Sequence, residues 1–189
     1  MPSDTMAGLQ PYSIRITPES LYECAKAFPR GADDIADARA RLAQALDGVV
    51  GGMASNDQTG KQWAASLDKA LHALFGTLSA AVTSVNGLGQ GLVQAANNVL
   101  VADHRSAIGR QDGQPFAYPL PYGPYTWQTD PGIPSAAGSG SPIWPSPLDK
   151  IPNGHQDRLR AAAGDLRSAA GSLQAAAMAL EGAITWDLG

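Results

Sequence analysis

Three histidines, His72, His104 and His155, and one cysteine, Cys24, are the side chains best suited to metal binding or nucleophilic chemistry. The histidines are scattered, and no Asp, Glu or Cys stands at metal-ligand spacing around them. A lone cysteine excludes an internal disulfide and a cysteine-based zinc site. We therefore expect no catalytic residues, no metal and no cofactor, with the histidines on the surface and Cys24 as a small buried hydrophobe.

The glycine cluster Gly87-Leu-Gly-Gln-Gly91 is superficially similar to a phosphate-binding loop. A dinucleotide-binding loop joins a strand to a helix, whereas this cluster interrupts a helical pattern. It predicts a bend or a close-packing site.

Charge excludes one class of partner. The chain carries 13 Lys and Arg against 17 Asp and Glu, a formal net charge of −4, whereas nucleic-acid binding needs a basic face. The N-terminus has neither a basic nor an apolar signal-peptide region, so we expect no cleavable signal peptide.

Proline divides the chain. Ten of its 14 prolines fall between Gly109 and Gly154, which excludes a helix there. The predicted organisation is an N-terminal tail (1–16), a helical hairpin (17–108), a Pro/Gly-rich strap (109–154) and a third helix (155–189). This is an all-α fold, a long antiparallel coiled-coil-like hairpin with a third helix packing on it or on a partner.

Capping residues locate the helices. Thr17 and Pro18 suit the start of a first helix, which ends near Gly48–Gly52 and is kinked by Pro29 and Gly31. A second helix begins near Asn56 or Asp57 and ends near Ile108, and a third covers about Gln156 to Thr185.

Apolar rows run along the second and third helices with alternating steps of four and three, the coiled-coil period. These rows predict the helix seams. The seam candidates on the second and third helices are Leu88, Leu92, Val99, Leu159, Leu166, Leu173 and Leu180.

Six of the chain's 12 aromatic residues lie in the strap, where a disordered linker would be poor in them. We expect several to dock on the helices, the alternative being a flexible spacer whose rings bind a partner. The six are Phe116, Tyr118, Tyr122, Tyr125, Trp127 and Trp144.

The segment Ala70–Ala102 contains no Asp, Glu, Lys or Arg, and its 33 residues are long enough to cross a bilayer. It also carries His72, Gln90, Gln94, Asn97 and Asn98, which are costly against lipid. We favour a bundle helix and keep a membrane-active channel segment as the alternative.

The chain resembles the WXG (ESAT-type) helical domains that lead type VII-secreted polymorphic toxins of actinobacteria, most nearly the mycobacterial outer-membrane-channel/necrotizing-toxin family. The resemblance covers roughly Thr17 to Gly182. It rests on these residues in this order: Gly52-Met53-Ala54, Asn56-Asp57, Thr59-Gly60, Trp63, Ile143-Trp144-Pro145 and Arg158-Leu159-Arg160-Ala161-Ala162-Ala163. The chain departs from the family's pattern in lacking a Trp-X-Gly turn and a Tyr-X-X-X-Asp/Glu signal.

The resemblance implies a non-enzymatic type VII (ESX) secretion and targeting module that folds in the cytoplasm and is then secreted or displayed at the cell surface. It would be the N-terminal part of a toxin or effector. Its partners would be small WXG-type hairpins and secretion components, with a membrane possible but not favoured. The candidate turn residues are Gly52, Met53, Asn56, Asp57, Gly60 and Trp63. Trp63 has two compatible interpretations, a plug packed near Leu46 and Val49 or part of a surface that the secretion apparatus contacts.

Overall fold

The computed structural model describes residues 16–107, 115–120, 131–138 and 154–187 of the chain. Its helices are α1 (Pro18–Ala25), α2 (Ala27–Val49), α3 (Gln58–Ser106) and α4 (Gln156–Asp187). No strand occurs in these residues, so the predicted all-α class is confirmed.

Side-chain caps fix where two helices begin. The Thr17 hydroxyl accepts the Ser20 N–H at 3.1 Å, and the Ser20 hydroxyl accepts the Thr17 N–H at 3.1 Å. The Asp57 carboxylate accepts the Gly60 N–H at 2.7 Å at the start of α3. Each bond satisfies an N–H that has no partner within its helix.

The predicted first helix is interrupted at Lys26, which separates α1 from α2. The sequence predicts this interruption at Pro29 and Gly31 instead. Proline has no N–H for the carbonyl of the residue four positions earlier, and its ring crowds that carbonyl. For Pro29 that residue is Ala25. The irregularity therefore falls in the preceding turn, and Pro29 itself lies within α2.

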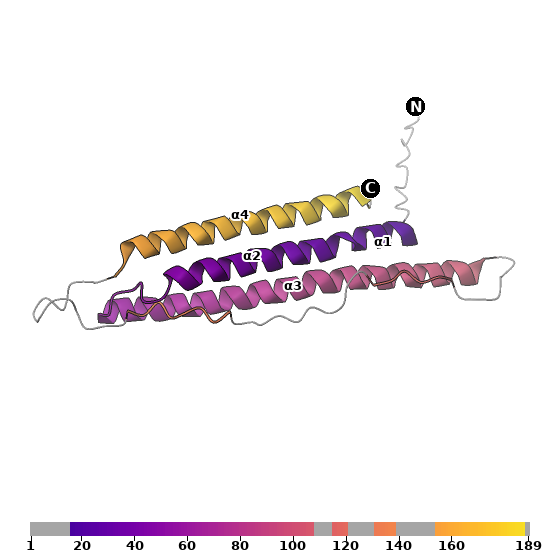
Figure 1. The fold of residues 1–189 in the computed structure, drawn as a ribbon. Helices are drawn as coiled ribbons and strands as arrows, with labels where there is room; N and C mark the ends of the chain where they lie inside the picture. Colours follow the sequence, from indigo (N-terminus) through magenta and orange to yellow (C-terminus); the bar gives the residue numbers. More distant parts are fainter. Residues whose placement is uncertain (1–15, 108–114, 121–130, 139–153, 188–189) are drawn as a thin grey trace, which may run out of the picture.

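Helices α1 and α2 form the middle rod of the bundle (Figure 1). After the turn, α3 runs back along α2 and α1 on one side, while α4 packs along α2, and less along α1, on the other. Between α3 and α4 no pair of Cα atoms lies within 8 Å. The two outer helices thus touch the middle rod without their backbones meeting.

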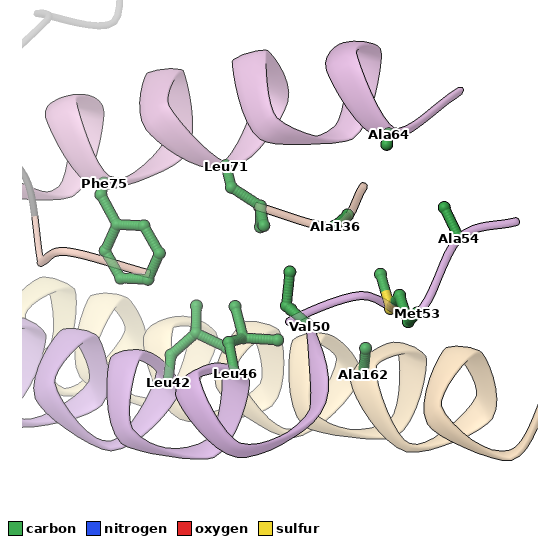
Figure 2. Packing of buried hydrophobic residues seen from close by; sticks show 10 residues of the cluster. All are labelled: Leu42, Leu46, Val50, Met53, Ala54, Ala64, Leu71, Phe75, Ala136 and Ala162. Carbon is green, nitrogen blue, oxygen red and sulfur yellow. The ribbon is translucent and has the colours of Figure 1, made fainter. Parts of the chain in front are cut away.

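The main apolar core lies at the turn end of the bundle (Figure 2). Leu42, Leu46 and Val50 from the middle rod face Leu71 and Phe75 of α3. Met53 and Ala54 from the turn, Ala136 from the strap and Ala162 from α4 complete the cluster. Full burial of a side chain such as Phe75 contributes about 2–3 kcal/mol. Because the cluster contains residues of α2, the turn, α3, the strap and α4, its burial holds these segments together at that end.

The packing face of α3 differs from the predicted seam. If the predicted row occupies the a and d positions of a heptad, the face buried against α1 and α2 consists mainly of the e and b positions. The buried residues at those positions are Phe75, Ser79, Val82, Asn86, Gly89, Val93 and Ala96. Beyond Leu78 the predicted row is therefore only partly covered, and Leu88 is 60% exposed.

A glycine contact explains this rotation of α3. A Cβ at position 89 would lie 2.8 Å from Cβ of Phe28 and 3.2 Å from the carbonyl oxygen of Ala25. Gly89 thus lets α3 approach the middle rod more closely than any larger residue would. The predicted row followed the four-and-three spacing of apolar residues and left Gly89 out, because glycine carries no apolar side chain. The row therefore selected the wrong face here.

Candidate interaction surface

The turn between α2 and α3 is largely internal. Met53 is 1% exposed, and Ala54, Ser55 and Gly60 are also buried. Gly52 adopts a φ of 68°, a left-handed conformation that favours glycine. Among the candidate turn residues, Gly52, Asn56 and Asp57 are half-buried and Trp63 is 42% exposed. Met53 and Gly60 are therefore internal, which leaves Trp63 as the most accessible of the candidates.

Two other segments clamp the turn. On one side the Gly52 N–H donates to the Ser135 carbonyl at 3.1 Å, and the Ala54 N–H donates to the Ala136 carbonyl at 2.9 Å. On the other side the His155 N–H donates to the Met53 carbonyl at 2.9 Å. The extended turn thus lies between the strap and the start of α4.

Asp68 of α3 fastens this part of the strap. Its carboxylate accepts the Ala136 N–H at 2.9 Å and also accepts the Ser135 hydroxyl. The sequence contained no signal for this pair, because its partners lie 67 and 68 positions away and a single acid beside a leucine is ordinary on a helix surface.

The strap also docks at the far end of α3. The Asn97 side chain accepts the Tyr118 N–H at 2.7 Å and donates to the Tyr118 carbonyl at 3.1 Å. The Tyr118 ring stacks on Tyr22 with centroids 4.4 Å apart, and its hydroxyl donates to Glu19 at 3.1 Å. Phe116 is 88% exposed. The predicted docking of Tyr122, Tyr125, Trp127 and Trp144 concerns residues outside the described ranges.

The contact between Tyr118 and Glu19 shifts the pKa values of both side chains. Burial, and then the hydrogen bond to Glu19, raise the pKa of Tyr118 above its usual value. The pKa of Glu19 is lowered, first by the backbone hydrogen bond to its own carboxylate and then by Tyr118. The neutral phenol and the ionised carboxylate are therefore the paired forms.

An apolar cleft of about 130 Å³ opens between α3 and α4. Its floor is Leu46 and Val50 of the middle rod, together with Met53. The α3 wall consists of Trp63, Leu67 and Leu71, and the α4 wall consists of Leu159, Ala162, Ala163 and Leu166. We call these ten residues the apolar cleft.

The cleft unites two sets of sequence candidates. Trp63 from the turn set lies across from Leu159 and Leu166 of the seam set. Leu173 and Leu180 are half-buried further along α4, and Leu92 and Val99 are half-buried on α3, none of them lining the cleft. A Cβ at Gly31 of α2 would lie 3.6 Å from Leu180 and 3.7 Å from Val85. Side chains of both outer helices thus lie close to Gly31, beyond the cleft.

Alanines explain why the α4 leucines line a cleft. The predicted seam places Leu159, Leu166 and Leu173 at d positions, but the buried residues between positions 156 and 184 of α4 are Ala162 and Ala176, at g positions. Small residues give α4 a close approach to α2 through this alanine row. The leucine row is left beside the contact and only half-covered.

Polar chemistry is sparse at this surface. An open hollow of about 910 Å³ adjoins the cleft at the turn and shares Met53, Trp63 and Leu159 with it. Its polar lining includes Asp57, whose pKa is lowered mainly by the hydrogen bond from the Gly60 N–H. Across the described ranges, no three His, Cys, Asp or Glu residues gather where they could hold a metal ion.

The charge-free segment Ala70–Ala102 forms part of α3. Of the helices that the structure describes, none combines the length and the apolar character required to cross a bilayer.

Comparisons with known proteins add no relative. The chain matches no protein-family model, no curated protein and no solved structure.

Proposed function

We propose that the chain is a non-enzymatic interaction module that binds a helical partner in the apolar cleft. The observation that carries the proposal is the half-covered leucine row of α4 facing Trp63 across that cleft. A partly exposed apolar cleft lined on both walls by long helices suits the apolar face of another helix. A partly exposed tryptophan at its edge has the character of a binding hot spot.

The biological setting proposed for this binding is type VII secretion. The resemblance of the turn and of the start of α4 to WXG-type toxin N-terminal domains supports it, and so does the cleft. In this proposal the chain folds in the cytoplasm, pairs there with a small WXG-type hairpin, and leads a secreted toxin or effector. No chemical step is assigned to the chain.

Co-expression tests the proposal. Small WXG-type hairpin proteins would be co-expressed with the chain, and complexes would be measured by size-exclusion chromatography with light scattering. We expect a stoichiometric complex with the unaltered chain. Exclusive recovery of the free monomer with every such hairpin would contradict the proposed function.

A matched pair of variants locates the binding. Trp63→Ala removes an accessible ring from the cleft and should weaken the complex at least about tenfold, the range of an interface hot spot. Leu88→Ala removes a residue of α3 that is 60% exposed and lies outside the cleft, and should leave binding unchanged. Equal effects of the two substitutions would place the partner elsewhere.

A further inference from the structure

The two rims of the apolar cleft differ in charge and in size. Along α4 the e positions beside the leucine row are Arg160, Arg167, Gln174 and Glu181, all exposed. Along α3 the g positions beside its row are Trp63, Ala70, Thr77, Ser84 and Gly91, also exposed and without charge. Both arginines fall beside the cleft, one position after Leu159 and Leu166 respectively.

Each rim implies something about an occupant. Past Trp63, the small side chains of the α3 rim let the backbone of a docked helix come close on that side. The two arginines on α4 carry positive charges one heptad apart. They occupy e positions, where charged residues of coiled coils form salt bridges that determine which partner helix binds. Neither Arg160 nor Arg167 forms an ion pair within the part of the chain that the structure describes.

We propose that the Arg160–Arg167 rim selects a partner helix with acidic residues one heptad apart, flanking the apolar row that fills the cleft. This inference rests on the proposed function and names the charge of its partner. The cleft walls run from Trp63 to Leu71 and from Leu159 to Leu166, so about two turns of the partner helix carry the recognition. A second copy of this chain is a poorer occupant, because it would bring the same basic rim.

Two designed peptides serve as probes. Both are 28-residue helices with leucine at every a and d position. One carries glutamate at every e and g position, the other lysine, and like charges keep each peptide from pairing with itself. Binding to the full chain is measured by fluorescence anisotropy at low and at high salt.

We expect the glutamate peptide to bind about tenfold more tightly than the lysine peptide, because two attractive charge pairs replace two repulsive ones. The difference should shrink in about 1 M salt, where charges are screened within about 3 Å.

Two double variants with the same change in net charge test the site. Arg160→Glu with Arg167→Glu should invert the preference toward the lysine peptide. Lys61→Glu with Lys69→Glu alters two exposed residues of α3 that do not line the cleft, and should preserve the preference for glutamate. Circular dichroism checks that both variants remain helical.

The outcomes separate this inference from the proposed function. Equal binding of both peptides, or equal effects of the two double variants, would overturn the charge selection while leaving the cleft as a helix-binding site. Failure of both peptides to bind the unaltered chain would overturn the charge selection, and a WXG-type hairpin that still bound would preserve the proposed function. An inverted preference only in the Arg160/Arg167 variant would support the inference.

Discussion

Gly89 of α3 lies directly against Phe28 of α2, so closely that a Cβ at position 89 would come 2.8 Å from that of Phe28. This contact sets the distance and rotation of α3 against the middle rod. It thereby favours burial of the α3 face that carries Gly89, Val93 and Ala96.

Gly89→Ala should therefore destabilise the bundle. Overpacking of this kind costs about 1–3 kcal/mol, which exceeds the roughly 0.5–1 kcal/mol that alanine gains over glycine within a helix. Chemical denaturation followed by circular dichroism measures the difference. Gly87→Ala is the matched control: a Cβ there meets nothing within 4 Å, so it should stabilise by about 0.5–1 kcal/mol. If both substitutions stabilise, the close contact does not exist in solution.

Arg39 is a charged residue on the buried face of α2, where it is 6% exposed. Its Nε donates to the Ser79 hydroxyl at 3.1 Å, and its guanidinium lies 5.5 Å from the Phe75 ring centre. Arg39→Ala removes both contacts and leaves a void, with an expected loss of about 2–4 kcal/mol.

Arg39→Met keeps the apolar stem and removes the buried charge, so we expect it to retain most of the stability. Thermal and urea unfolding of the two variants compare them. Equal losses for alanine and methionine would mean that the charge, and not the packing of the stem, is what α3 requires at this site.

Asp68→Ala should release the strap from the turn. The Gly52 and Ala54 amides, which donate to strap carbonyls, should then exchange hydrogen faster, whereas the His155 amide, which donates to Met53, should keep its protection. Hydrogen exchange followed by NMR distinguishes these three amides. Unchanged exchange at Gly52 and Ala54 would show that Asp68 does not hold the strap.

Tyr118 gives the docked strap a pH dependence. Its raised pKa means that the folded state favours the neutral phenol. The stabilisation is therefore complete below the usual tyrosine pKa of about 10 and is lost as pH rises through the higher folded value. Glu19 acts in the opposite sense: its lowered pKa gives a contribution that is present above the usual range and lost as pH falls.

Ultraviolet titration of the unaltered chain against Tyr118→Phe isolates the Tyr118 ionisation, which we expect above pH 10. Glu19→Gln should move that ionisation back toward the usual value. A Tyr118 ionisation at or below the usual value in the unaltered chain would contradict the contact with Glu19.

The sequence predicted the helices better than their contacts. Caps at Thr17 and Asp57 depend on neighbours three residues away, so local chemistry was sufficient to place them. The interruption at Lys26 was predicted a few residues too far along the chain, at Pro29, because a proline disrupts the helical turn that precedes it. The buried face of α3 was missed because leucines dominate a hydrophobic row, whereas Gly89 and Ala96 make the closest packing possible.

The same reasoning applies to the candidate site. Trp63, Leu159 and Leu166 were singled out from the sequence, and the structure brings them together in one cleft. Burial of Met53 could not be foreseen, because it involves Ala136 of the strap, more than 80 positions away. Gly60 is covered by Ser55 of its own turn. The roles of Asp68 and Asn97 likewise arise from long-range backbone partners.

The central claim is that a helical partner fills the cleft between α3 and α4. The most direct measurement is methyl NMR of the leucine-labelled chain during titration with a WXG-type hairpin. The account predicts intermolecular contacts and shifts at Leu67, Leu159 and Leu166, with Leu88 unchanged. A saturable complex whose contacts fall at Leu88 and leave the cleft leucines unchanged would contradict it.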